Sequence, residues 1–379
     1  MKMYAVGGAI RDTLMGLPIN DVDFVVVGST VEEMIARGYR PVGKDFPVFL
    51  HPQTQAEYAL ARTERKSGIG YKGFHFYADP TVSLEQDLER RDLTINAMAQ
   101  EVGADGQWIG PIIDPFNGQA DLAAKIFRHV SDAFAEDPLR LLRIARFSAR
   151  FPEFSIAEET LLALKAIVNS DELNALSAER IWQELARGLV ASKPMHMFQV
   201  LLNTSAAKTI LPSNLASLLA KEAFREELIE HYDKASNHLE ERCAITLMGL
   251  PASEIRSWAN AIRMPIEVRD FSEIFSDLGR LVNQYPDGLY PAVDVLAWFN
   301  RADIWRKPDR GQLLLDLAER LGFKVSVLIA AMRHAQALST ADIISGVAAE
   351  DRSNGERIGS AFESARLAAI TSALQSSAN

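Results

Sequence analysis

Residues 7–23 read GGAIRDTLMGLPINDVD, and this stretch predicts a glycine turn, a short helix that stops at Gly16 and the start of an apolar strand. Another apolar strand, over residues 3–6, leads into it, and the second strand spans residues 21–27. Side chains two apart on a strand project to the same side, so we expect Asp21 and Asp23 to present two carboxylates to one face. Mg²⁺ in proteins is usually held by one or two carboxylates together with substrate phosphates. The stretch therefore predicts a magnesium site that a nucleotide completes.

The glycine pair predicts phosphate binding. Two glycines before a helix let backbone N–H groups approach an anion closely, and the helix N-terminus carries a partial positive charge. We therefore expect Gly8 to contact a phosphate group. Arg11 lies one turn into the helix, where its guanidinium can add a bidentate grip on the same phosphate.

A second informative stretch, residues 136–147, reads EDPLRLLRIARF. Asp before Pro is a common helix start, with Asp137 as N-cap and Pro138 as the first helical residue. Arginines recur at three- to four-residue spacing and form one basic stripe on this helix: Arg140, Arg143, Arg146 and Arg150. Four arginines on one face repel one another unless acidic groups lie against them, and we interpret the stripe as facing a polyanion.

Arg91 lies immediately before a helix that we expect to begin at Leu93, with Asp92 as its cap. An arginine is poorly placed at the positive end of a helix dipole. Its position therefore indicates an anionic partner. A weak surface salt bridge, for instance with Glu89, is the alternative.

The composition is that of a folded protein, with 379 residues, 48% of them hydrophobic, and the length predicts two or more domains. A net charge of −10 argues against a wholly basic nucleic-acid-binding surface but allows a local basic groove. A single cysteine, Cys243, excludes an intrachain disulfide, and no apolar run has the length of a signal or a membrane span. We expect a cytoplasmic monomer that contacts no membrane.

Four motifs together resemble the bacterial class II tRNA nucleotidyltransferases: the glycine pair, the Asp-x-Asp separated from it by twelve residues, RRDLTINAMA at 90–99 and EDPLRLLRIARF at 136–147. Within these CCA-adding enzymes, the likeness is to the multifunctional CCA protein type. It implies an α+β fold in which a small polymerase β-like nucleotidyltransferase head, with a mixed sheet and helices, precedes an all-α neck, body and tail. We expect the head over residues 1–130, the neck with its nucleotide-base reader over 131–195, and the tRNA-binding body and tail over 196–379.

The resemblance implies template-independent addition and repair of the 3′-terminal CCA of tRNA from CTP and ATP, with two Mg²⁺ ions and release of pyrophosphate. Asp21 and Asp23 match the catalytic metal ligands. The remaining matches bind the nucleotide: Arg91 at its triphosphate, Asp137 and Arg140 at the base edge, and Arg143 and Arg146 at the next basic positions. Glu57 is a candidate third carboxylate or an ordinary exposed strand residue. The basic, glycine-rich residues 62–73 are expected to form a mobile loop.

The chain departs from the multifunctional CCA protein type in its second half. Residues 241–254 read ERCAITLMGLPASE, and Met248 and Gly249 stand where that type carries the His-Asp pair of an HD phosphohydrolase. A thioether and a hydrogen cannot replace imidazole and carboxylate ligands, so we expect phosphatase, 2′-nucleotidase and phosphodiesterase activities to be absent.

Two alternatives stay open. A bacterial poly(A) polymerase shares the head motifs but uses ATP alone, and Asp45 and Pro52 favour CCA addition over it. A catalytically inactive RNA-binding protein is the other, and the intact Asp21 and Asp23 argue against it.

Overall fold

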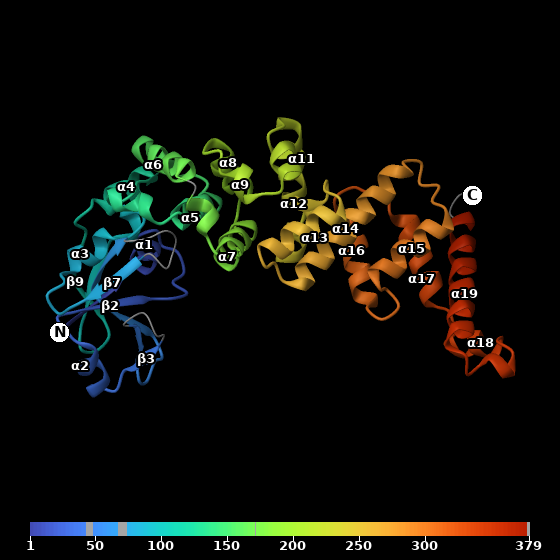
Figure 1. Ribbon diagram of the computed structural model, residues 1–379, viewed down its shortest axis with the longest axis horizontal. Helices are drawn as coiled ribbons and strands as arrows, with labels where there is room; N and C mark the ends of the chain where they lie inside the picture. Colours follow the sequence, from blue (N-terminus) through green and yellow to red (C-terminus); the bar gives the residue numbers. More distant parts are fainter. Residues whose placement is uncertain (43–47, 67–73, 171, 377–379) are drawn as a thin grey trace. The chain divides into compact units, whose positions relative to one another are not determined.

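The computed structural model describes residues 1–42, 48–66, 74–170 and 172–376 (Figure 1). Asp45 and residues 67–73 of the predicted loop lie outside the described residues. The chain forms two compact units, the first from residues 1–188 and 192–210 and the second from residues 189–191 and 211–379. The predicted boundaries at residues 130 and 195 stay predictions.

A seven-stranded mixed sheet forms the centre of the first unit, in the order β3-β4-β5-β2-β1-β8-β9. Its strands are β1 (Lys2–Val6), β2 (Asp23–Val27), β3 (Arg40–Val42), β4 (Val48–Leu50), β5 (Glu57–Leu60), β8 (Ala99–Val102) and β9 (Trp108–Ile113). β2 and β5 run parallel, with Phe24 opposite Tyr58, and the other neighbouring strands are antiparallel. The sheet confirms the α+β class of the head.

The two central strands are buried on both faces. Tyr4, Val6 and Val25 belong to one apolar cluster, while Ala5 packs with Ile10 of α1 (Gly8–Leu14) on the other side. Buried apolar residues on both faces leave the ends of the strands as the places where polar groups can gather. Asp23 is the first residue of β2, and Asp21 lies in the segment just before it.

Helices and two small strand pairs complete the first unit. The helices are α2 (Val31–Ala36), α3 (Leu84–Glu89), α4 (Gly118–Ala124), α5 (Leu139–Arg150), α6 (Glu158–Asn169), α7 (Ala178–Leu189), α8 (Met195–Asn203) and α9 (Ala207–Ile210). β6 (Arg62–Lys66) pairs with β7 (Phe74–Ala78), and β10 (Ile126–Phe127) with β11 (Ser155–Ile156). The loop expected over residues 62–73 is therefore wrong for its first five residues, because they pair as a strand.

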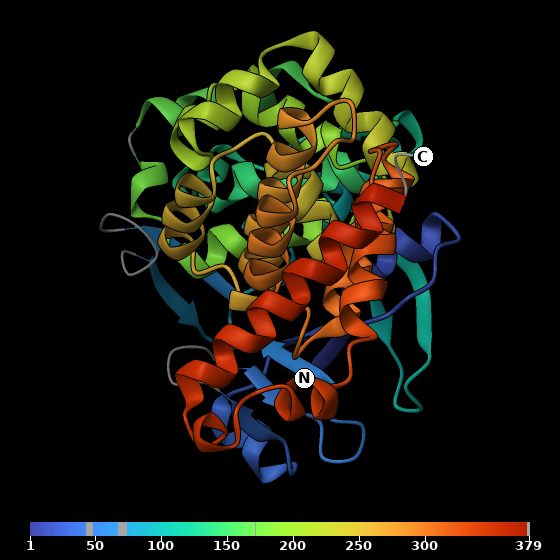
Figure 2. The same ribbon diagram turned by 90° about the vertical axis from the view of Figure 1, so that its right-hand side faces the viewer.

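The described part of the second unit is all helical. It comprises α10 (Ser213–Leu219), α11 (Glu222–Lys234), α12 (Leu239–Leu247), α13 (Ala252–Ala261), α14 (Ile266–Gln284), α15 (Ala292–Ala302), α16 (Pro308–Arg320), α17 (Ser326–Gln336), α18 (Thr340–Ser345) and α19 (Gly355–Ser376). The long helix α19 packs against α17 and α15 (Figure 2). None of the helices in the described ranges combines the length and apolar character needed to cross a membrane.

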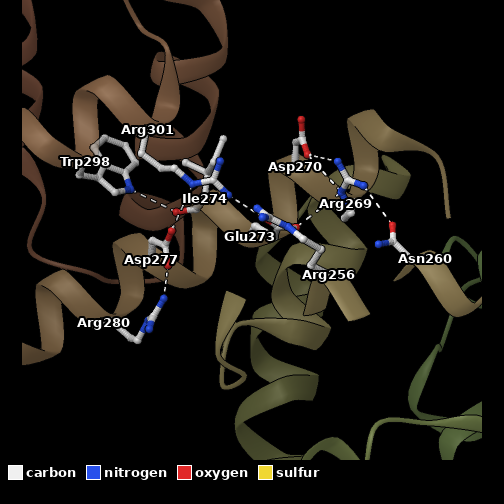
Figure 3. A network of polar contacts seen from close by, with 10 residues as sticks. All are labelled: Arg256, Asn260, Arg269, Asp270, Glu273, Ile274, Asp277, Arg280, Trp298 and Arg301. Carbon is white, nitrogen blue, oxygen red and sulfur yellow. Dashed lines mark hydrogen bonds and ion pairs between the residues drawn. The ribbon is translucent and has the colours of Figure 1, made fainter. Parts of the chain in front are cut away.

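A buried carboxylate joins three helices of the second unit (Figure 3). Glu273 of α14 is 0% exposed and accepts ion pairs from Arg256 of α13 and Arg301 of α15. Arg269, one turn before it on α14, lies 3.5 Å from the same carboxylate. A buried charge is tolerated only when it is paired, so these arginines neutralise Glu273 and thereby tie α13 and α15 to α14.

Candidate active site

A cavity of about 900 Å³ lies within the first unit. The β1–α1 turn, the starts of β2 and β5, residues 90–96, α5 and α7 line it. It brings together every residue that the sequence predicted for the site: Gly8, Arg11, Asp21, Asp23, Arg91, Asp137, Arg140, Arg143 and Arg146. Segments more than a hundred residues apart in the sequence thus line one site.

Three carboxylates occupy one edge of this cavity. Asp23 is the first residue of β2, and Glu57 is the first residue of the parallel neighbour β5. Asp21 lies two residues before β2, so the strand predicted over residues 21–27 begins later than expected. The two strands are in register, and the rings of Phe24 and Tyr58 stack 4.4 Å apart one residue further on. Among contacts between described residues, no arginine or lysine pairs with any of the three carboxylates. Among the described residues the three carboxylates do not lie close enough together to hold a metal ion by themselves, so a divalent cation at this edge would need oxygen ligands from substrate phosphates.

The glycine turn brings two arginines close to the backbone. Gly7 has φ of 73°, and a Cβ there would lie 2.9 Å from Arg91 Nη1. A Cβ on Gly8 would lie 3.4 Å from Arg11 Nη2. A side chain at Gly7 would push against the Arg91 guanidinium, and at Gly7 the backbone conformation itself favours glycine. The turn therefore places backbone N–H groups and two cations around one point.

Arg11 is fixed by neighbours on several sides. Only 3% exposed, it donates from Nε and Nη2 to Asp12 Oδ1 at 2.9 and 2.8 Å and from Nη1 to Asn96 Oδ1 at 2.5 Å. Burial lowers the pKa of its guanidinium, and the Asp12 carboxylate opposes that shift. Arg150 of α5 donates to the other oxygen of Asp12 at 2.9 Å. Asp12 thus ties the glycine helix α1 to α5.

Asp92 is a buried partner of α5 and not the helix cap that the sequence predicted. Only a 3-10 turn, Thr94–Asn96, follows it, with Leu93 at the N-cap position. Arg143 donates to Asp92 Oδ2 at 2.7 Å, and the Asn96 amide donates to Oδ1 at 3.0 Å. Burial alone would raise the pKa of this carboxyl, but Arg143 and Asn96 outweigh burial and hold the pKa well below its usual range.

Asp137 lies one position further from the helix than expected, since Pro138 is the N-cap and α5 begins at Leu139. Its Oδ1 nevertheless accepts from the Leu139 N–H at 3.0 Å, while Arg180 of α7 reaches Oδ2 at 3.4 Å. Arg140 is 7% exposed and donates to the carbonyl oxygens of Ala133 and Arg90, at 3.1 and 2.5 Å.

Carboxylates of the protein pair with three of the four arginines of the α5 stripe, so the repulsion among these three is relieved without an external polyanion; that the stripe faces a polyanion stays a prediction. Arg143 pairs with Asp92, Arg146 with Glu184 at 2.5 Å, and Arg150 with Asp12. These carboxylates come from residues 92, 184 and 12, which no spacing within α5 could reveal. A guanidinium has five N–H donors, so such pairing leaves donors for a ligand.

Helix α7 supplies cavity residues that the sequence reasoning missed. Arg180 and Arg187 both line the cavity, and Glu184 between them holds Arg146. Residues 180, 184 and 187 follow helical spacing and share one face. That periodicity was the available signal, although the same pattern also describes a solvated charged face.

Comparisons with known proteins agree with this geometry. A family model described as "Poly A polymerase head domain" matches residues 3–128, and one described as "Probable RNA and SrmB- binding site of polymerase A" matches residues 153–218. Proteins named "Multifunctional CCA protein" from Burkholderia mallei and Burkholderia cenocepacia are each 44% identical over 412 aligned residues, covering 99% of both chains. The chain belongs to the multifunctional CCA protein family.

Solved structures show the same fold as this family member. A CCA-adding enzyme in an apo form superimposes with a TM-score of 0.69 at 20% identity, covering 96% of this chain and 88% of the other. A CCA-adding enzyme in complex with CTP gives 0.68 at 21% identity, covering 97% and 87%. At such identities the likeness concerns the fold alone.

The second half of this chain was also expected to lack a metal site. Within the described ranges, no three His, Cys, Asp or Glu side chains gather closely enough to hold a metal ion. His231 is 6% exposed, its ring packs edge-on against Phe323, and its Nδ1 has no hydrogen-bond partner among the residues that the structure describes. Burial lowers the pKa of this imidazole. The expected loss of phosphohydrolase activity stays a prediction.

Proposed function

We propose that this protein adds and repairs the 3′-terminal CCA of tRNA, using CTP and ATP without a nucleic-acid template and releasing pyrophosphate. The 44% identity, over the full length, with proteins named "Multifunctional CCA protein" supports this CCA-adding activity. The observation that carries it is the division of the cavity, in which unpaired Asp21 and Asp23 lie at one edge and the arginines of α5 at another. Nucleotidyl transfer requires both a metal site and a surface that binds the nucleotide.

The proposed ion is Mg²⁺, held by Asp21 and Asp23. When bound, it would neutralise charge on the phosphates and lower the pKa of the attacking hydroxyl, as in two-metal sites. The Gly8 N–H, Arg11 and Arg91 would bind the triphosphate, since all three surround the same turn. Fixed positions matter here because phosphoryl and nucleotidyl transfers gain most of their rate from positioning and charge stabilisation.

We propose that Asp137 and Arg140 select cytosine and adenine. A carboxylate accepts from the exocyclic amine that cytosine and adenine share, and a guanidinium donates to their ring acceptors. The contact from Arg180 and the Leu139 N–H hold Asp137 in place. Two carbonyls hold Arg140, which still has N–H donors for a base. Arg143 and Arg146 are the proposed further nucleotide contacts.

The test is incubation of the protein with Mg²⁺, labelled CTP or ATP, and tRNA transcripts that end before the first C, after one C or after both. Addition of two C and one A to the shortest transcript is the expected result. Incorporation of AMP alone, extended into a tail, would instead identify a poly(A) polymerase. No incorporation on any transcript would favour the catalytically inactive alternative.

Two further expectations accompany this function. We propose that the protein lacks a metal-dependent 2′,3′-cyclic phosphodiesterase, because Met248 and Gly249 replace the His-Asp pair; detecting that activity in the purified protein would show otherwise. We also propose that it works as a monomer in the cytoplasm, where its tRNA and nucleotide substrates are found. Size-exclusion chromatography with light scattering tests the monomer.

A further inference from the structure

One arginine that lines the cavity differs from the others in its contacts. Ten arginines line the cavity, and nine of them contact a carboxylate or carbonyl of the protein. Arg187, near the C-terminal end of α7, is the tenth, and within the described residues it has neither an ion pair nor a hydrogen bond through its side chain. Its positive charge is therefore available to a ligand.

The arrangement of α7 against α5 places Arg187 relative to the base reader. Arg180 contacts Asp137, just before α5, and Glu184 contacts Arg146 on α5, so positions further along α7 lie further from Asp137. Arg187 lies seven residues beyond Arg180, which is about 10 Å along a helix. It therefore lines the cavity roughly two turns beyond the end where Asp137 lies.

Exposure separates Arg187 from the proposed nucleotide contacts. Arg11 and Arg140 are 3% and 7% exposed, whereas Arg187 belongs to the exposed residues. A strand of RNA must enter from solvent to bring its 3′-hydroxyl to Asp21 and Asp23. An exposed, unpaired guanidinium at the cavity matches a phosphodiester of that strand, because arginine binds phosphate oxygens through two parallel hydrogen bonds.

We infer that Arg187 binds a backbone phosphate of the RNA near its 3′ end, and so positions the acceptor strand for addition. This inference rests on the proposed function for the identity of the RNA. The RNA, as the second substrate, would then contact α7, separately from the nucleotide contacts on α1 and α5.

The test compares Arg187→Gln with Lys165→Gln in the full-length protein. Lys165 is an exposed cation of α6 in the same unit and does not line the cavity, so both variants lose one positive charge from a helix. For Arg187→Gln we expect the KM for tRNA lacking CCA to rise about tenfold, the size of one charge-assisted hydrogen bond. The KM for CTP is expected to stay at the wild-type value, and Arg187→Lys should recover part of the loss.

Binding without turnover gives a second measurement. The logarithm of the tRNA association constant falls linearly with the logarithm of salt concentration, and one lost contact to a single strand reduces the slope by about 0.7. We expect that reduction for Arg187→Gln and no change for Lys165→Gln. This assay requires no catalysis, so it still tests Arg187 if the wild-type protein adds no CMP and the proposed function itself fails.

Three results would overturn the assignment. A rise in the KM for CTP with unchanged tRNA binding would place Arg187 at the nucleotide. Equal losses in the Arg187 and Lys165 variants would indicate a general effect of net charge. Unchanged tRNA affinity and salt slope in Arg187→Gln would show that the residue binds no phosphate.

Discussion

Replacing Asp12 with asparagine is the most direct test of how the site is held together. The carboxylate bonds Arg11 through one oxygen and Arg150 through the other. Asparagine keeps the shape of the side chain but removes the negative charge. Arg11 is then left as a buried cation without its carboxylate.

The expected cost follows from the burial of each partner. The side chains of Arg11 and Asp12 are 3% and 11% exposed, and breaking such a buried pair costs about 3 kcal/mol. Arg150 is 38% exposed, so its ion pair with Asp12 contributes as much to stability as a surface pair does, about 0.5 kcal/mol. We therefore expect Asp12→Asn to destabilise the first unit by about 3 kcal/mol, and Arg150→Met by less than about 1 kcal/mol.

Hydrogen exchange measured by mass spectrometry is the suitable assay, because a chain of two units need not unfold in one step. Peptides from β1, α1 and α5 should lose protection in Asp12→Asn, while peptides from α14 and α17 keep it. If Asp12→Asn and Arg150→Met reduce the free energy of opening equally, the buried Arg11 contact does not stabilise the unit, and the reasoning is wrong.

Three other predictions follow from the same structure. Asp21→Ala combined with Asp23→Ala should reduce CMP incorporation at least about a thousandfold while leaving the Kd for tRNA unchanged; retained incorporation would contradict the metal site. Glu273→Gln should destabilise the second unit by about 1 to 2 kcal/mol in urea unfolding, because three arginines lose their shared partner; an unchanged midpoint would contradict this role. Burial lowers the pKa of His231 in the folded state, so the unfolded chain binds more protons and stability should fall as pH drops below about 6.5. His231→Leu should remove that component of the pH dependence, and an identical pH profile in the variant would refute it.

Local patterns predicted the part of the site that lies within single segments. The glycine turn, the helix after it and the carboxylates at the start of β2 all form from residues 7–23. The capping box of α2 is another local feature, since Thr30 and Glu33 bond each other's backbone N–H groups. Such features depend on neighbours a few residues away, which is the range over which sequence patterns carry structural information.

Contacts between distant segments could not be predicted in this way. Asp92 reads as a helix cap because its neighbours in sequence suggest one, yet Arg143, fifty-one residues later, accounts for its position. Residues 62–66 read as a loop because they are charged and precede glycines, but β7 provides a pairing partner and makes them a strand. In both cases the tertiary partner outweighs the local preference.

The pairing of charges explains how a chain of net charge −10 can present a site for polyanionic substrates. Carboxylates such as Asp92 and Glu184 neutralise the arginines of α5 in advance, so these side chains are already ordered before a substrate binds. A ligand that meets preordered donors loses less affinity to conformational entropy than one that must order flexible side chains. Within the described part of the cavity, and apart from Arg140, which donates to two carbonyl oxygens, the charged groups without an ion pair are Asp21, Asp23, Glu57 and Arg187. Those are the groups whose partners change when a metal ion and an RNA strand arrive, so substitutions of the carboxylates should weaken metal binding and substitution of Arg187 should weaken RNA binding.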